Sequence, residues 1–162
     1  MAEAYEEIID GETLRRAAPG TRHEEVCARL HASVTASLAT VATARLLAPR
    51  TLVQFSAGTM LRPDLTMVTV ATGKVWLVAE VIESGDNHAD TVYKKSFYEA
   101  LNLPRLWMVD PRYNNLEVYH GSRYGLALKG ILAGREVLSE QLLPQLSLSM
   151  NELFGTLPRE QV

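Results

Sequence analysis

The sequence has little cysteine and no long hydrophobic run. A single cysteine among 162 residues excludes a disulfide-stapled scaffold and a cysteine-rich zinc fold. The longest unbroken apolar run, from Val75 to Ala79, is only five residues long, whereas a membrane-spanning helix needs about 18. The chain is therefore not expected to cross a membrane.

Basic residues are not in excess either. The chain has 16 Lys and Arg against 19 Asp and Glu, a net charge of −3, so nucleic-acid binding would need a local basic strip. The first twelve residues carry five acids and no base, which is unlike a secretory signal. These acids are Glu3, Glu6, Glu7, Asp10 and Glu12. A reducing, cytoplasmic setting is the resulting expectation.

What remains is a globular composition at the length of about one domain. Hydrophobic residues make up 47% of the chain, which excludes a disordered protein. No internal repeat and no long linker divides the sequence, so residues 1–162 are predicted to form a single domain.

The N-terminal part predicts a β-hairpin followed by a long helix. Asp10-Gly11 lies between two strand-like segments, 5–9 and 13–16, and suits a tight turn because glycine accepts positive φ. Thr21 and Glu24 have the spacing of a capping box. Apolar residues then recur at helical spacing over about 25 residues, which predicts a helix that Pro49 ends. They are Val26, Leu30, Val34, Leu38 and Val41.

The middle of the chain predicts a strand–helix–strand crossover. Residues 65–70 and 74–82 are strand-like, and the second run is apolar enough to be covered on both faces of a sheet. Asp90 is predicted to cap a helix through Leu101, and residues 106–109 form another buried strand. The expected fold is α/β (α+β), with a mixed central sheet between a long N-terminal helix and a crossover helix.

Two carboxylates are unusual for this predicted strand pair. Glu80 interrupts the apolar strand, and Asp64 stands where the preceding strand begins. A fully buried, unpaired carboxylate is so costly that such groups are normally paired, protonated or metal-bound. A three-residue loop over 71–73 pairs Val70 with Lys74 and brings Asp64 opposite Glu80, about 5 Å away. A four-residue loop would spoil this alignment.

Two ionised carboxylates at about 5 Å repel by roughly 3 kcal/mol at an effective dielectric constant near 20. A divalent cation between them reverses the sign, and ligation by oxygen alone favours Mg²⁺ or Mn²⁺. Lys94 and Tyr98 lie on one face of the predicted crossover helix. If that face is turned toward the carboxylates, a metal, two acids and a lysine form the minimum set for hydrolysing a phosphodiester.

Each of these residues also has a purely structural interpretation. In this interpretation Asp64 is simply a turn residue after Pro63. Glu80 can be paired with Arg62 or Lys94, and Lys94 can belong to a solvated helix face. Spacing alone also indicates an ordinary structural or surface place for His23, Glu12 and Tyr98.

The order of the motifs adds information that single residues do not. The sequence has a Y-E-E-I-I-D-G-E hairpin (5–12), a Pro63-Asp64 pair and an A-E-V-I-E-S strand (79–84). A D-x-x-x-K-x-x-x-Y helix (90–98) and an N-L-P-R-L-W-M-V-D-P segment (102–111) follow. In this order they resemble the Uma-two family of bacterial restriction-endonuclease-like proteins, assigned to the PD-(D/E)XK nuclease superfamily.

The resemblance implies a restriction-endonuclease-like fold and a metal site. Asp64, Glu80 and the main-chain carbonyl of Val81 would bind Mg²⁺ or Mn²⁺. The superfamily's lysine stands two residues after the acid, where this chain has Ile82, so Lys94 would take its role. Glu12 and His23 would complete the rim of the pocket, supported by Asp90 and Tyr98.

The function that follows is a Mg²⁺-dependent endonuclease acting on DNA as a homodimer. The alternative is a nuclease-like scaffold that binds nucleic acid or a protein partner without cutting. The acidic segment 83–88, which replaces the family's usual S-P-S-T, and the negative net charge motivate the alternative. A metal-dependent hydrolase of a small phosphoester is a third interpretation.

Overall fold

The computed structural model describes residues 3–83 and 88–155, with only the backbone for residues 88–90. Its centre is a six-stranded sheet in the order β10-β9-β8-β7-β6-β3. The parallel pair is β7–β8, and the other neighbours are antiparallel. The strands are β3 (Ala44–Leu46), β6 (Leu65–Thr69), β7 (Val75–Val81), β8 (Arg105–Asp110), β9 (Asn115–Ser122) and β10 (Gly125–Ala133).

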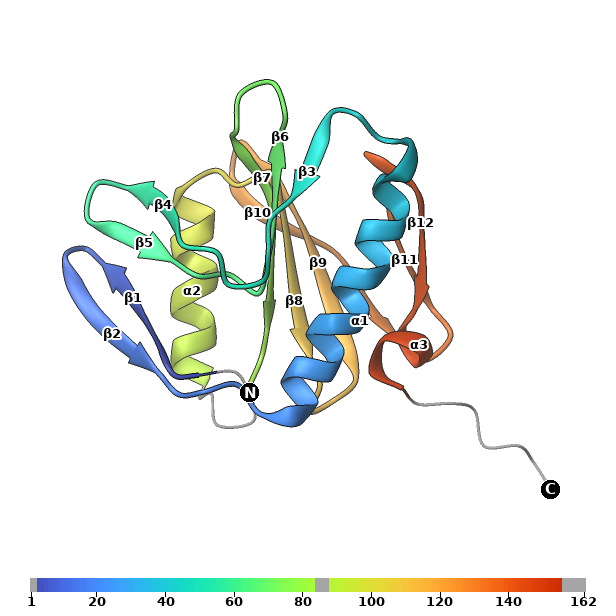
Figure 1. Ribbon diagram of the computed structural model, residues 1–162, viewed down its shortest axis with the longest axis horizontal. Helices are drawn as coiled ribbons and strands as arrows, with labels where there is room; N and C mark the ends of the chain where they lie inside the picture. Colours follow the sequence, from blue (N-terminus) through green and yellow to red (C-terminus); the bar gives the residue numbers. More distant parts are fainter. Residues whose placement is uncertain (1–2, 84–87, 156–162) are drawn as a thin grey trace.

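Different elements cover the two faces of this sheet (Figure 1). One face packs on α1 (Thr21–Ser37), α3 (Met150–Phe154) and the β11–β12 hairpin (Val137–Glu140 and Leu143–Ser149). The other face packs on α2 (His88–Ala100) and on a second, antiparallel sheet in the order β2-β1-β5-β4. Its strands are β1 (Tyr5–Ile9), β2 (Glu12–Arg16), β4 (Val53–Ser56) and β5 (Thr59–Leu61).

The mixed sheet, the N-terminal hairpin and the crossover confirm the predicted fold class. Asp10 and Gly11 both have positive φ, 50° and 81°, as the tight turn requires. Strands β7 and β8 are parallel and joined through α2, which makes the predicted crossover. The crossover helix begins at His88, two residues before the predicted Asp90.

The long N-terminal helix is shorter than predicted. Helix α1 ends at Ser37, and a 3₁₀ turn, η1 (Leu38–Thr40), and strand β3 follow before Pro49. The chain leaves the helix because β3 pairs with β6 and forms the edge of the main sheet. The capping box was also wrong. Thr21 is the first helical residue, and the N-cap is Gly20, without a side-chain hydrogen bond.

The β6–β7 turn also differs from the prediction, but the register at Asp64 is the predicted one. The Thr69 N–H bonds to the Lys74 carbonyl at 2.9 Å, which closes a four-residue turn instead of a three-residue one. A register shift at Trp76 then offsets the change, so that Leu65 pairs with Ala79. One residue further along each chain, Asp64 lies opposite Glu80.

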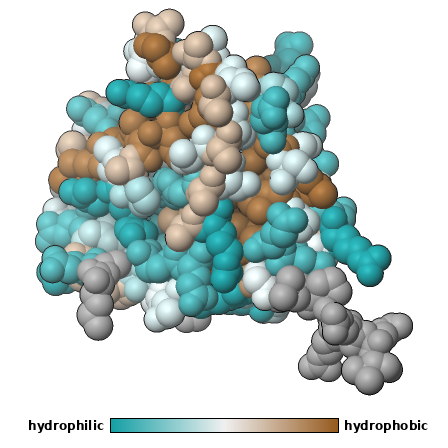
Figure 2. Space-filling view, turned by 45° about the vertical axis from the view of Figure 1, so that its right-hand side comes forward, coloured by the Kyte–Doolittle hydropathy of each residue, from teal (hydrophilic) through white to brown (hydrophobic). Residues whose placement is uncertain are grey.

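The carboxyl end of β7 and the start of β6 meet at the end of the sheet where α1 begins (Figure 1). The face of the molecule in Figure 2 is mainly hydrophilic at this end and more hydrophobic toward the opposite one. In the described part of the chain, no helix is long and apolar enough to cross a membrane.

Candidate active site

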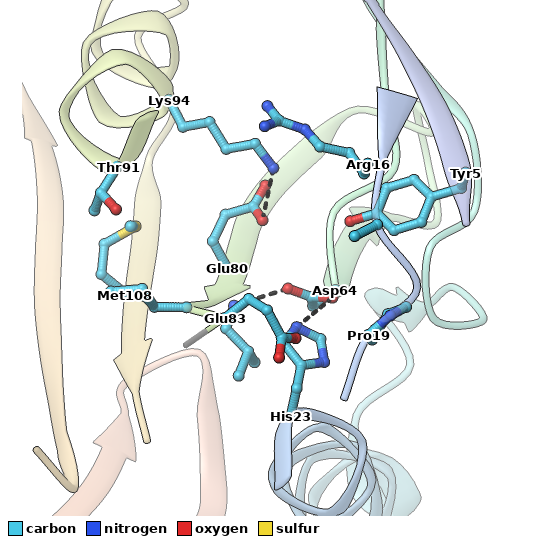
Figure 3. Close-up of a pocket in the computed structure, with 13 residues that line it drawn as sticks. Tyr5, Arg16, Pro19, His23, Asp64, Glu80, Glu83, Thr91, Lys94 and Met108 are labelled. Carbon is cyan, nitrogen blue, oxygen red and sulfur yellow. Dashed lines mark hydrogen bonds and ion pairs between the residues drawn. The ribbon is translucent and has the colours of Figure 1, made fainter. Parts of the chain in front are cut away.

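Asp64 and Glu80 both line a pocket of about 80 Å³ at this end of the sheet (Figure 3). They share it because neighbours on the same face of paired strands point the same way. The pocket is closed by β1 and β2 on one side and by α2 on the other. Its further lining includes Tyr5, Arg16, His23, Val81, Glu83, Thr91, Lys94 and Met108.

Asp64 is 3% exposed and is held on both oxygens. Its Oδ2 accepts a hydrogen bond of 2.8 Å from the Val81 amide. Its Oδ1 lies 3.3 Å from Nε2 of His23 and 3.4 Å from a guanidinium nitrogen of Arg50. Burial raises the pKa of Asp64, but the hydrogen bond and charge of His23, with the Val81 amide and the charge of Lys94, keep the pKa below its usual value. Asp64 is therefore an ionised carboxylate.

Glu80 is 6% exposed, and its surroundings stabilise its ionised form less than those of Asp64 do. Its Oε1 accepts a hydrogen bond of 2.6 Å from the Tyr98 hydroxyl, and its Oε2 lies 3.2 Å from the Lys94 ammonium. Burial raises the pKa of Glu80 to about 7, although the charge of Lys94 opposes this shift. The nearby charges of Asp64 and Glu7 add to the rise. The ionised form of Glu80 is therefore opposed mainly by burial and also by the charges of these two acids.

Lys94 lies between two buried carboxylates. Its ammonium is 3.2 Å from Glu80 and 3.3 Å from Oε1 of Glu7 on β1. Burial lowers the pKa of Lys94, but these two carboxylates raise it above its usual value. The ammonium is consequently charged and fixed in position.

Glu7 is a pocket neighbour that the sequence reasoning missed. It is fully buried, and it accepts hydrogen bonds from Nε of Arg16 at 2.9 Å and from the Arg62 amide at 2.8 Å. Burial raises the pKa of Glu7, but Lys94 and these donors outweigh it and lower the pKa. Strand alternation carries a signal, because Glu7 shares the inward face of the predicted strand with Ile9.

The main chain of Val81 contributes to the same side of the pocket. Along a β-strand, successive residues direct their N–H and C=O groups toward opposite neighbouring strands. The Ile82 N–H bonds to the Val109 carbonyl of β8, so the peptide groups of Val81 turn the other way, toward Asp64. Two carboxylates and one carbonyl make an oxygen donor set that suits Mg²⁺ or Mn²⁺. Within residues 3–83 and 88–155, no three His, Cys, Asp or Glu side chains gather as metal ligands.

A model of the family described as "Uma2: Putative restriction endonuclease" matches residues 2–151 of this chain. The chain belongs to the Uma2 family. It is also similar to a crystal structure described as "a putative nuclease belonging to DUF820" from Anabaena variabilis ATCC 29413, with a TM-score of 0.75 and 13% identity. The match covers 93% of this chain and 89% of that one, and at this identity it concerns the fold alone. No curated protein matches the chain.

The structure does not bring together every residue that the Uma2 resemblance implied. Glu12 is exposed at the start of β2 and does not line the pocket. His23 lies in the first turn of α1, is buried and contacts Asp64. Burial lowers the pKa of His23, but the hydrogen bond and charge of Asp64 raise it to about 9. The side chain of Asp90, and segment 84–87, lie outside the described residues.

Tyr98 is fully buried on α2 and donates to Glu80. It also packs edge-on against Phe55 and Phe97, with ring centroids 5.6 and 5.7 Å away. Burial in this apolar group raises the pKa of Tyr98 well above its usual value, so the hydroxyl stays protonated. The phenol can therefore fix one oxygen of Glu80, and the other oxygen remains turned toward Lys94.

Proposed function

We propose that this chain is a metal-dependent nuclease in which Asp64, Glu80 and the Val81 carbonyl bind Mg²⁺ or Mn²⁺. The observation that carries the proposal is the convergence of two buried carboxylates and the Lys94 ammonium in one pocket. The Uma2 family membership supports a nuclease, and the oxygen donors fit a hard divalent cation. DNA as the substrate, a homodimer and a cytoplasmic location remain parts of this proposal.

A bound divalent cation would neutralise a phosphate and lower the pKa of a coordinated water. The residues of the chain have distinct tasks around it. Tyr98 and the Val81 amide each fix one oxygen of a carboxylate. Lys94 has three N–H donors and lies beside Glu80, so it can orient a water or stabilise negative charge on the scissile phosphate.

Asp64→Asn tests the proposal directly. The substitution keeps the size of the side chain but removes its charge, so cleavage of single- or double-stranded DNA with Mg²⁺ or Mn²⁺ is expected to fall at least about 100-fold. Mn²⁺ binding, measured by calorimetry, is expected to weaken in parallel. The matched control is Glu6→Gln, an exposed acid on β1, which should leave both unchanged. Equal cleavage by Asp64→Asn and the wild type would reject the proposal.

The non-cutting scaffold is the second candidate. The observation that favours it is that each carboxylate already has a cationic neighbour, Arg50 and His23 at Asp64 and Lys94 at Glu80. Calorimetry separates the two candidates, because a scaffold of this kind should take up no Mn²⁺ that depends on Asp64 and Glu80.

Glu7 has its own task within the proposed site. A cation on Glu80 would compete with Lys94 for that carboxylate, whereas Glu7 would still hold the ammonium 3.3 Å away. Glu7→Gln is therefore expected to lower kcat about 10- to 100-fold and to leave Mn²⁺ affinity nearly unchanged. Glu7→Asp should restore part of the rate. Loss of Mn²⁺ binding in Glu7→Gln would instead indicate that Glu7 is itself a ligand.

A further inference from the structure

A second recess of about 120 Å³ adjoins the candidate active site. The two cavities share His23, Ile82 and Glu83 as lining residues. The rest of the recess is formed by Arg22, at the start of α1, and by Pro111 and Arg112, in the turn between β8 and β9. A chain of nucleotides bound at the first cavity would therefore have a cationic neighbouring site to enter.

Arg22 provides a positive charge in a fixed position. One guanidinium nitrogen donates to the Phe154 carbonyl at 2.5 Å, and the other donates to Oδ1 of Asn114 at 2.8 Å. Both acceptors are neutral, and within the described residues no carboxylate contacts this guanidinium. Its charge is thus neutralised by no acid there, which favours an anionic ligand.

Arg112 lines the recess, and Tyr113 follows it in the turn between β8 and β9. Asp110 fixes Arg112 by accepting from its amide at 3.0 Å, from Nε at 3.0 Å and from a terminal nitrogen at 2.9 Å. The fixed guanidinium lies 5.5 Å from the centroid of the Tyr113 ring. Tyr113 is 73% exposed, so a large part of an aromatic ring is open to solvent beside a cationic cavity.

We propose that this recess is a subsite for one unpaired nucleotide of a single-stranded nucleic acid, an inference that rests on the nuclease function proposed above. The phosphate lies against Arg22 and Arg112, and the base stacks on Tyr113. Stacking on an aromatic ring beside an arginine is a common mode of single-strand binding. A base inside a duplex has both faces covered by its neighbours, so the ring favours unpaired nucleotides.

Among the described residues that line the recess, Glu83 is the one acid. Its Oε2 accepts a hydrogen bond of 3.2 Å from the Gly20 amide, just before α1. The carboxylate is therefore drawn to the start of the helix, where the helix dipole favours negative charge. Arg22 and Arg112 form the wall on which a phosphate can bind.

The chain contains a matched control for Tyr113. Arg123 and Tyr124 repeat the same dipeptide at the opposite end of β9, roughly 25 Å away along the strand. The Arg123 guanidinium lies 5.2 Å from the Tyr124 ring centroid, and Tyr124 is 87% exposed. The two pairs thus share composition, a close arginine–ring contact and an exposed tyrosine, and they differ in their distance from the pocket and in the contact of Arg112 with Asp110.

The test is equilibrium binding of fluorescent oligonucleotides with EDTA present, so that no cleavage occurs. Single-stranded DNA, single-stranded RNA and duplex DNA of equal length are compared by anisotropy. Tyr113→Ala is expected to weaken single-strand binding about 10-fold, with little effect on the duplex. Tyr113→Phe and Tyr124→Ala should bind like the wild type. Arg22→Gln should weaken binding and lower the slope of log K against log salt by about one.

Two results would overturn the subsite. The first is an equal effect of Tyr113→Ala and Tyr124→Ala, and the second is wild-type binding that is no tighter for single strands than for the duplex. Failure of the nuclease proposal gives a different result. In that case Tyr113-dependent binding persists in EDTA, while neither Mg²⁺ nor Mn²⁺ produces cleavage that depends on Asp64.

Discussion

Lys94→Met is expected to abolish most nuclease activity and to destabilise the fold at the same time. Methionine keeps the length of the side chain but removes the charge. Loss of a group that orients a water or stabilises developing charge costs about 100- to 1,000-fold in rate. Removing one partner of a buried ion pair costs about 3–5 kcal/mol, and here two buried carboxylates, Glu7 and Glu80, lose the same cation.

The destabilisation should depend on pH. Without Lys94, the pKa values of Glu7 and Glu80 rise in the folded state, because the charge of Lys94 lowers both. An acid whose folded pKa lies above its unfolded pKa destabilises the protein above the folded pKa, and this cost disappears below the unfolded pKa. The deficit of Lys94→Met, measured by urea unfolding, should therefore be largest near pH 8 and much smaller near pH 5.

Lys95→Met is the matched control for this substitution. Lys95 is the next residue of α2, and its ammonium lies 4.5 Å from the Tyr119 ring centroid, with no ion pair to an acid of the described residues. Its replacement should lower the free energy of unfolding by about 1 kcal/mol or less and leave cleavage unchanged. A pH-independent deficit in Lys94→Met, or an equal loss in Lys95→Met, would contradict the role assigned to the buried ammonium.

The features that the sequence predicted well are those with local chemical causes. The hairpin follows from Asp10-Gly11, which accept the positive φ of the turn. The crossover follows from an apolar strand, a helix and a second apolar strand in sequence. Glu80 could be singled out because a carboxylate within a buried run has few stable environments.

Other features depend on partners that are distant in the sequence. The apolar spacing that starts at Val26 continues through Val41 and predicts a longer helix. Helix α1 nevertheless ends at Ser37, because the following segment gains hydrogen bonds when β3 pairs with β6. The shift at Trp76 restores a register that the turn alone would have lost. Glu7 looks like any acid of an exposed hairpin until α2 brings Lys94 against it.

Glu80→Gln is expected to stabilise the protein, whereas most substitutions of a buried charged residue destabilise it. Above pH 7 the wild-type protein holds an ionised carboxylate at a position whose burial opposes the charge. Glutamine has nearly the same shape and no charge, and Glu7 still pairs with Lys94. The variant should therefore be more stable than the wild type at pH 8, by up to about 3 kcal/mol.

The pH dependence follows from the raised pKa of Glu80, from 4.5 to about 7. Between these values the folded state binds more protons than the unfolded state, so the stability contributed by this group falls as pH rises. Above about pH 7 the full cost is present, and below about pH 4.5 it is absent. The stability difference between variant and wild type should consequently vanish near pH 4.5 and reach its full value near pH 8.

Added Mg²⁺ or Mn²⁺ should make the wild type more stable than Glu80→Gln, which reverses the order expected without metal. A cation that binds only the folded state stabilises it by mass action, and Glu80 is a proposed ligand, so the wild type gains stability and Glu80→Gln does not.

Glu140→Gln is the matched comparison, because Glu140 is a buried acid paired with Arg105 at 3.0 Å, outside this pocket. That substitution should destabilise the protein with or without metal. If Glu80→Gln also destabilises it at pH 8, Glu80 is an ordinary structural partner of Lys94, and burial does not oppose its charge as this prediction requires.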